Sequence, residues 1–285
     1  MLKIAHIIHP VMAAPPSDLV AAQPITFETM KIAREFAAGI AGISLYAVQY
    51  HDEDRIPLPA CFIRTPDIRR SVFDLKTFKK KRKLALIKDI LDTLYESAGE
   101  ADYFIYTNVD IALQPYFYKA VARIIAQGCE AFTINRRTIT GKYASLREIP
   151  LMYAEIGESH KGYDCFVFKR EIYPAFKLGT ICIGTAWIGR ALLANLAAYA
   201  AVFKEFRNEH LTFHIGDPCP WRREEFSDYF RQNREEYLKI FGRLEKERGE
   251  FTPDWQAYLL NTGDRRIFPN FKSNRFADKA TAKEC

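Results

Sequence analysis

The sequence lacks several features that would place it in a familiar class. No stretch of the 285 residues reaches the roughly 18 consecutive apolar residues that a membrane-spanning helix needs, so no transmembrane segment is expected. The six cysteines are scattered, without a C-x-x-C pair or the dense spacing of a disulfide framework. A reducing, cytoplasmic location is therefore expected. There is neither a P-loop nor the G-x-S-x-G turn of a serine hydrolase.

The chain also lacks internal repeats, low-complexity segments and a linker rich in Pro, Gly and Ser. With 48% apolar, 14% aromatic and 27% charged residues, it has the composition of a folded protein with a substantial core. A single domain over residues 1–262 is predicted, followed by a polar, basic C-terminal tail over residues 263–285. The composition does not indicate an oligomeric state.

Short apolar runs alternate with segments of helical periodicity, and this alternation predicts the fold class. Strands are predicted over residues 2–9, 42–51, 102–109, 130–137, 162–171 and 209–217. Helices are predicted over residues 26–38, 81–98, 116–127 and 224–248, with another within 181–203. We expect an α/β protein with a mostly parallel central sheet and helices on both of its faces.

The segment "ADYFIYTNVDIAL" (101–113) places an amide and a carboxylate, Asn108 and Asp110, at the end of an apolar strand. Alternation along the strand puts both side chains on the same side of the backbone. A buried polar pair is costly unless loop hydrogen bonds or a bound cation satisfy it. Because ligands of such sheets sit outside the carboxyl ends of the strands, this position favours a binding site.

Two later strands carry polar side chains of the same kind. Asp164 lies in "GYDCFVF" (162–168), and His214 lies in "TFHIGD" (212–217). Together with a diphosphate, Asp110 and His214 would form a mixed oxygen and nitrogen site that suits Mn²⁺ or Mg²⁺. A histidine bonded to a backbone carbonyl is the alternative for His214.

These motifs, taken in order, resemble those of a known family. The chain is similar to nucleotide-sugar-dependent glycosyltransferases of the GT-A fold, a Rossmann-like domain whose D-x-D motif ends a central strand. It resembles bacterial members with an N-x-D variant, matched here by residues 108–110. Those proteins continue with a G-x-D-x-F-x-F strand, an I-G-x-x-W-D turn and a late histidine, matched by residues 162–168, residues 183–188 and His214. The similarity spans residues 3–217.

The resemblance implies transfer of a sugar from a nucleotide-diphosphate donor to a hydroxyl acceptor, assisted by a divalent metal. Asp110 would bind the metal that carries the diphosphate, and Asn108 would contact the ribose or a metal-bound water. Asp164, the only carboxylate inside "GYDCFVF" (162–168), is the first candidate for the base that takes the acceptor's proton. An Asp that fixes the turn after Gly162 is the alternative. Neither the sugar nor the acceptor is identified by these motifs.

Three other residues are candidates for donor binding, each with a structural alternative. His9 ends the first strand and would face the nucleotide, or it is packed or solvated like an ordinary histidine. Arg136 follows "FTIN" and would reach a phosphate, or it forms a surface ion pair. Trp187 would stack on a sugar or base, or it belongs to the core.

The net charge is +6, and six of the eight residues in "KTFKKKRK" (76–83) are basic. A helix predicted to begin near Leu84 would let the N–H groups and charges of this run converge on one anion. Lys83 is the residue of the run that we assign to the donor, and a solvated helix start is the alternative. No nucleic-acid-binding motif accompanies the run, so a nucleic-acid partner is not expected.

Two other functions remain open at this point. A nucleotidyltransferase-like enzyme on a similar sheet would bind a nucleoside triphosphate in preference to a diphosphate sugar. A non-catalytic nucleotide-sugar-binding protein would keep the fold without the chemistry. Two departures from the family pattern bear on that second alternative, because Asn108 stands in place of the first acid and Ile188 in place of the acid after Trp187.

Overall fold

The computed structural model describes residues 1–160, 162–216, 223–260 and 274–277. Its strands are β1 (Lys3–Ile8), β2 (Gly42–Ala47), β3 (Phe62–Arg64), β4 (Tyr103–Thr107), β5 (Ala112–Leu113), β6 (Ala131–Ile134), β7 (Arg137–Ile139), β8 (Glu158–Ser159), β9 (Cys165–Lys169), β10 (Phe203–Phe206) and β11 (Thr212–Ile215). The central sheet has the order β10-β6-β9-β4-β1-β2-β3, in which β9 alone runs against the others. A smaller sheet has the order β5-β11-β7-β8.

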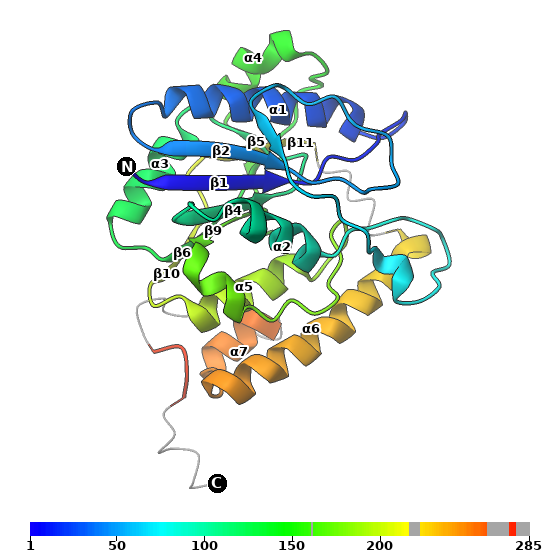
Figure 1. The fold of residues 1–285 in the computed structure, drawn as a ribbon, viewed down its shortest axis with the longest axis vertical. Coiled ribbons are helices and arrows are strands. Elements are labelled where there is room, and N and C mark those ends of the chain that lie inside the picture. Colours follow the sequence, from blue (N-terminus) through cyan, green and yellow to red (C-terminus); the bar gives the residue numbers. More distant parts are fainter. Residues whose placement is uncertain (161, 217–222, 261–273, 278–285) are drawn as a thin grey trace, which may run out of the picture.

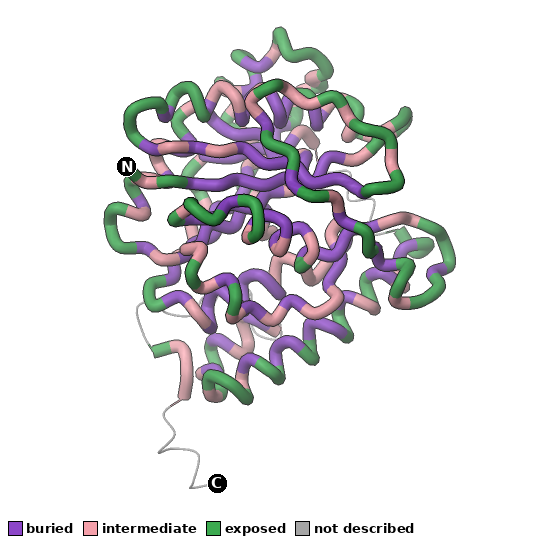
Figure 2. The backbone as a smooth tube through the Cα atoms, viewed as in Figure 1, coloured by how far each residue is buried: buried purple, intermediate pink, exposed green. Residues whose placement is uncertain are grey.

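Helices cover both faces of the central sheet (Figure 1). They are α1 (Leu19–Phe36), α2 (Ile87–Ser97), α3 (Phe117–Ala126), α4 (Ile149–Ala154), α5 (Ile188–Tyr199), α6 (Ser227–Arg248) and α7 (Pro253–Leu260). One cluster of buried apolar side chains joins α1 and α3 to the sheet, and another joins α2, α5, α6 and α7 to it. The strands between these layers are largely buried (Figure 2). The predicted α/β architecture with a mostly parallel sheet is thus confirmed.

None of the described helices combines the length and the apolar character that crossing a bilayer requires. The first helix, α1, begins seven residues before the predicted start at residue 26 and contains Pro24. Gln23, in this extra part of α1, exchanges two hydrogen bonds of 2.8 Å with the backbone of Val11. These bonds fix the loop that follows β1 against the helix, which positions His9 at the end of that strand.

The start of α2 differs more strongly from the sequence prediction, because the basic run (76–83) lies before the helix in non-helical backbone. Leu86, next to the helix, forms a β-bridge with Cys182. Within the run, the Arg82 N–H donates to the Tyr229 hydroxyl at 2.8 Å. The prediction that the N–H groups of the run meet an anion at a helix start is therefore wrong. Tertiary pairing overrides the helical propensity of this segment.

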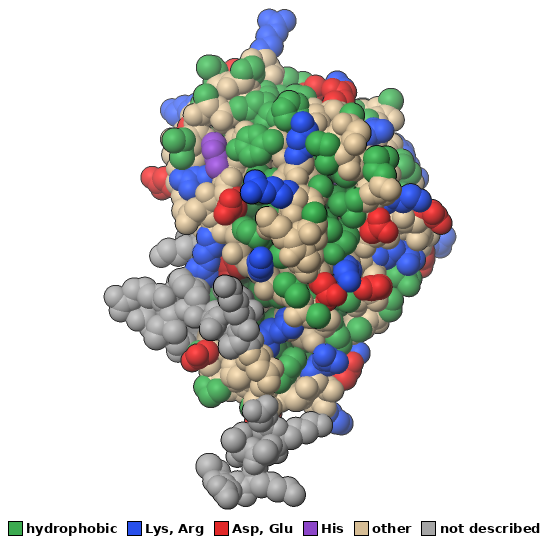
Figure 3. Space-filling model, turned by 90° about the vertical axis from the view of Figure 1, so that its left-hand side faces the viewer, with side chains coloured by type: hydrophobic (Ala, Val, Ile, Leu, Met, Phe, Trp, Pro, Cys, Tyr) green, Lys and Arg blue, Asp and Glu red, His purple; other side chains and the backbone are tan. Residues whose placement is uncertain are grey.

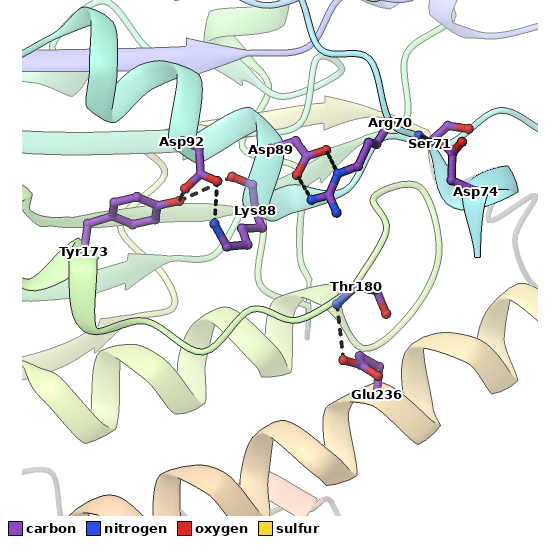
Figure 4. A network of polar contacts seen from close by, with 9 residues as sticks. All are labelled: Arg70, Ser71, Asp74, Lys88, Asp89, Asp92, Tyr173, Thr180 and Glu236. Atoms are coloured by element: carbon purple, nitrogen blue, oxygen red, sulfur yellow. Dashed lines mark hydrogen bonds and ion pairs between the residues drawn. The ribbon is translucent and has the colours of Figure 1, made fainter.

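Polar contacts hold α2 and the preceding loop in place (Figure 4). The guanidinium of Arg70 donates to both carboxylate oxygens of Asp89, and such two-point pairs are the stronger kind of ion pair. On the same helix, Asp92 accepts a hydrogen bond of 2.6 Å from the Tyr173 hydroxyl. Arg70 lies before the basic run (76–83) and Asp89 lies after it. Their ion pair therefore fixes both ends of the segment that contains the run.

Residues 274–277 belong to the predicted tail, and they pack against the domain. Phe276 forms an antiparallel bridge with Phe251, and the two rings stack with their centroids 4.9 Å apart. The Arg275 guanidinium donates to two backbone carbonyl oxygens just after α5. The rest of the predicted tail lies outside the described residues, and its boundary at residue 262 stays a prediction.

His6 is buried in β1 between two hydroxyl groups. Its ring nitrogens lie 2.8 Å from Tyr118 Oη and 2.9 Å from Thr107 Oγ1. Burial lowers the pKa of His6 from 6.5 to about 3, so the folded protein keeps the ring neutral. Because the unfolded chain protonates this ring more readily, folding loses stability as the pH falls from 6.5 toward 3 and is unaffected by His6 above that range.

We predict that the free energy of unfolding falls more steeply with decreasing pH in the unchanged protein than in His6→Gln. The difference in slope should approach about 1.4 kcal/mol per pH unit between about pH 6 and about pH 4. Chemical denaturation of both proteins across this range measures it, and the other titrating groups cancel in the comparison. Equal slopes would show that His6 does not stay neutral in the fold.

Candidate functional site

A cavity of about 380 Å³ opens where the carboxyl ends of β1, β4 and β6 meet. Its walls include all eight residues predicted from the sequence to act in donor binding, metal binding or catalysis: His9, Lys83, Asn108, Asp110, Arg136, Asp164, Trp187 and His214. The face at the amino ends of the strands carries basic, acidic and apolar side chains interspersed with one another (Figure 3). The candidate residues are therefore gathered at the edge of the sheet where the topology predicts a ligand.

The reversed direction of β9 brings Asp164 to this edge. Cys165, the first residue of β9, pairs with Thr107 and Ile134, which are the last residues of β4 and β6. Asp164 therefore lies beside the segments that follow those two strands. Its Oδ1 accepts a hydrogen bond of 3.2 Å from Arg136, and both side chains are buried. Arg136 is thus part of the cavity wall, and its ion pair with Asp164 is buried.

The second carboxylate oxygen of Asp164, Oδ2, is not used in the contact with Arg136. This oxygen is buried and forms no hydrogen bond with any described residue. A buried carboxylate oxygen without a donor is costly, since its lost hydration is not replaced. Because Asp164 lines the cavity, a hydroxyl group of a bound ligand would satisfy this oxygen while Arg136 holds the other one.

Asp110 and His214 meet across the cavity wall, although 104 positions separate them in the chain. His214 Nδ1 lies 2.7 Å from the carbonyl oxygen of Gly216, so this nitrogen carries a proton and donates it. Nε2 of the same ring lies 3.2 Å from Asp110 Oδ2. In a neutral ring this second nitrogen presents a lone pair, which would face the carboxylate. Either a proton or a cation must therefore lie between the two groups.

The pKa values of this pair shift in opposite directions. Burial alone lowers the pKa of His214, but the hydrogen bond and the charge of Asp110 outweigh it, so the pKa is raised above 6.5. For Asp110, burial acts to raise the pKa, whereas the contact with His214 and the charge of Arg136 lower it below its usual value. The carboxylate is therefore ionised at neutral pH and attracts a cation.

Asp110 and His214 provide only part of a metal coordination sphere. In the chain as far as the structure describes it, no group of three or more His, Cys, Asp or Glu side chains is placed to hold a metal. Asp110 Oδ1 is nevertheless buried without a hydrogen-bond partner among those residues. This oxygen and the Nε2 lone pair fit a divalent cation that takes its remaining ligands from a diphosphate and water, as Mg²⁺ commonly does. Metal binding itself stays a prediction.

His9 presents a neutral acceptor to the cavity. Its Nδ1 lies 2.9 Å from the carbonyl oxygen of Val48 and therefore donates to it, which leaves Nε2 as an acceptor. Burial lowers the pKa of His9 to about 4, and the charge of Lys83 adds to this, against the opposing effect of the Val48 hydrogen bond. At neutral pH His9 is therefore suited to accept a hydrogen bond from a base or ribose, and not to bind a phosphate by charge.

Lys83 reaches the cavity wall, but its charge already has partners. The ammonium lies 2.5 Å from Asp52 and 3.3 Å from Glu53, and it stands 3.9 Å from the centre of the Tyr50 ring. A phosphate would have to compete with two carboxylates for this group. The assignment of Lys83 to the donor stays a prediction, which this pairing does not favour.

Trp187 packs against the core and also lines the cavity, and its stacking on a sugar or base stays a prediction. Its ring packs against Tyr237 and Phe230 of α6, with centroids 5.4 and 5.9 Å away, and the residue also lines the cavity. Its backbone φ of 75° lies in the left-handed region, which is unusual for a bulky residue and costs on the order of 1 kcal/mol. Packing on α6 holds this conformation at the point where α5 begins.

Among the other residues of the cavity wall, Tyr106, Arg82 and Thr185 are polar residues to which the sequence pattern assigns no role. Tyr106 donates from its hydroxyl to Asn108 Oδ1 at 2.9 Å, and the alternation of strand residues would have placed the two side chains together. Arg82 neighbours Lys83 in the basic run, where nothing in the sequence distinguishes one cation from the next. Thr185 lies in a turn whose residue type gives no signal.

No protein-family model matches the chain, and no curated protein matches it. Among solved structures, residues 1–349 of S. aureus TarS align with 84% of this chain and 66% of that fragment, at a TM-score of 0.46 and 9% identity. The same fragment in complex with UDP-GlcNAc gives a TM-score of 0.45 and 9% identity, over 84% and 67% of the two chains. A longer TarS structure aligns with 93% of this chain and 44% of that chain, at a TM-score of 0.48 and 10% identity. This chain therefore spans less than half of that TarS chain, and none of these similarities assigns an activity to it.

We predict that Asp110→Asn lowers the pKa of His214, because burial and the charge of Arg136 then act without the opposing carboxylate. An NMR titration of the His214 ring protons measures this pKa directly. Asp18→Asn is the matched control, since it removes another carboxylate from the cavity wall. A His214 pKa that is the same in Asp110→Asn as in the unchanged protein would contradict the pairing.

Proposed function

We propose that the protein is a glycosyltransferase that moves a sugar from a nucleotide-diphosphate donor to a hydroxyl acceptor with the help of Mn²⁺ or Mg²⁺. The observation that supports this most strongly is the gathering of all eight predicted residues around one cavity at the carboxyl edge of the sheet. Residues 104 positions apart, Asp110 and His214, contact each other there. This arrangement is what the N-x-D motif and the late histidine of the resembling family would require.

Asp110 and His214 would hold the metal, with Asp110 Oδ1 as a ligand oxygen that no described residue hydrogen-bonds. When bound, the cation would supply positive charge to the phosphate that departs from the sugar. Asn108, whose Oδ1 is held by Tyr106, would direct its amide toward the donor ribose or a water molecule. His9 would accept a hydrogen bond from the nucleoside, because its ring is neutral at physiological pH.

Asp164 would orient the acceptor hydroxyl and take its proton. Arg136 fixes one carboxylate oxygen at 3.2 Å, and the other oxygen is without a donor among the described residues. A carboxylate held in this way cannot rotate freely, so the direction from which it accepts a proton is set in advance. We assign the role of base to Asp164, since Ile188 stands where the resembling family carries a further acid.

We predict that a nucleoside diphosphate raises the melting temperature in the presence of Mn²⁺. A ligand at 100 times its dissociation constant adds about 2.7 kcal/mol of stability, so a thermal-shift screen of nucleoside diphosphates, triphosphates and nucleotide sugars detects it. Asp110→Asn should remove the Mn²⁺-dependent part of this affinity, because it deletes the anionic ligand. Glu100→Gln, at the exposed amino end of β4, makes the same chemical change away from the cavity and should not affect it.

Affinity that does not depend on Mn²⁺, or that survives in Asp110→Asn, would contradict this proposal. Preference for a nucleoside triphosphate over every diphosphate sugar would favour nucleotidyl transfer instead. Binding of a diphosphate sugar that is never cleaved would favour a non-catalytic binding protein.

We predict that Asp164→Asn lowers the turnover of the donor by at least about a hundredfold, because the amide cannot take a proton. Release of the nucleoside diphosphate from the donor measures turnover, with water in the place of the acceptor hydroxyl. Donor affinity should change little, and the melting temperature separates this effect from loss of the fold. Unchanged turnover would instead leave Asp164 the role of positioning Arg136.

A further inference from the structure

The N-terminus of α5 forms one wall of the cavity and carries no negative charge. Ile188 and Gly189, the first two residues of the helix, line the cavity. The first turn of α5 contains no acidic residue, and no described side chain caps it. The first N–H groups of a helix have no acceptor within the helix, and they carry the positive end of its dipole. This end of α5 is therefore suited to an anion.

A buried hydroxyl group lies directly before this helix. Thr185 is 6% exposed and lines the cavity, and its Oγ1 has no hydrogen-bond partner among the described residues. It is preceded by Gly184, whose φ of 73° forms the turn that leads into α5. A hydroxyl that is buried at a cavity wall without a partner indicates that a ligand supplies the missing bond.

Arg82 adds a positive charge at the same place. Its Nη1 donates to the carbonyl oxygen of Gly184 at 3.3 Å, so the guanidinium lies against the turn before α5. Its backbone N–H is held by Tyr229, and its guanidinium stands 5.5 Å from the centre of the Phe226 ring. Unlike Lys83, Arg82 forms an ion pair with no carboxylate in the described part of the chain.

Burial lowers the pKa of Arg82, and the charge of Asp18 offsets this only in part. An arginine nevertheless remains protonated at any physiological pH. The cavity wall thus holds a half-buried cation whose charge is compensated only in part, next to a helix end of the same sign. Such a combination is costly in an empty cavity and is stabilised by an anionic ligand.

We propose that Arg82, Thr185 and the first turn of α5 form a phosphate-binding subsite that needs no metal. A tetrahedral phosphate has enough acceptor oxygens to bond a guanidinium, a hydroxyl and helix N–H groups together, and arginine matches it with two parallel donors. This subsite is distinct from Asp110 and His214, because the carboxylate of Asp110 does not attract a phosphate without a cation. It goes beyond the proposed function, because it requires neither a sugar nor a metal.

The test is isothermal titration of the full chain with pyrophosphate in excess EDTA. We expect binding by the unchanged protein and a loss of about tenfold or more in Arg82→Gln, as for other charge-assisted hydrogen bonds to phosphate. Arg82→Lys keeps the charge and should still bind more weakly, since the two-point contact is gone. Thr185→Val should weaken binding, whereas Thr185→Ser keeps the hydroxyl and should restore it.

Lys81→Gln is the matched control, because it removes one exposed charge from the same run. It should leave the affinity within about twofold. No binding of pyrophosphate in EDTA would overturn the proposal. An equal loss in Arg82→Gln and Lys81→Gln would also overturn it, since general attraction by the basic run would then explain the binding.

The origin of the phosphate is decided by competition with the nucleoside diphosphate found in the screen. Displacement of pyrophosphate by that nucleotide supports a subsite for the donor diphosphate. Simultaneous binding of both supports a subsite for a phosphorylated acceptor. If no nucleotide binds, the proposed function fails, while the pyrophosphate titration still tests the subsite by itself.

Discussion

Strand β9 runs antiparallel to both of its neighbours, and the position of the candidate site depends on this reversal. In a wholly parallel sheet, the residue before β9 would lie at the amino edge, far from the ends of β4 and β6. Because Cys165 pairs with the last residues of those strands, Asp164 instead lies at the carboxyl edge and contacts Arg136. A buried carboxylate and a buried guanidinium compensate each other there, which makes two charged side chains tolerable next to the core.

The cavity wall carries charges of both signs. Asp110 supplies a carboxylate that a cation beside His214 would complete, whereas Arg82 and the N-terminus of α5 form a positive site. A backbone carbonyl oxygen positions one side chain of each site: that of Gly216 accepts a hydrogen bond from His214, and that of Gly184 accepts one from Arg82. Each of these hydrogen bonds uses only one nitrogen of the side chain. A ligand with a diphosphate and a polar group would meet both kinds of wall. Preorganised charges of this sort are how enzymes stabilise charge that develops during a reaction.

Much of the fold and of the site follows from the sequence, because the relevant signals are local and periodic. Apolar strands alternating with amphipathic helices predict the sheet, and the rule that ligands lie at strand ends brings Asp110 and His214 together. What the sequence does not reveal is decided by tertiary contacts. Leu86 lies within the helix predicted over residues 81–98, yet it forms a β-bridge with Cys182. As a result, α2 begins only at Ile87. Arg82 and Lys83 look alike in the basic run until other segments supply carboxylates to only one of them.

The central claim is that one cavity at the carboxyl edge binds a metal and a nucleotide diphosphate together, and a crystal structure with Mn²⁺ and a nucleoside diphosphate tests it most directly. Anomalous scattering locates the Mn²⁺ independently of the rest of the map. The account predicts a single strong peak next to Asp110 and His214, with phosphate oxygens on the metal and the nucleoside beside His9. Mn²⁺ bound away from Asp110, or a nucleotide bound outside this cavity, would contradict it.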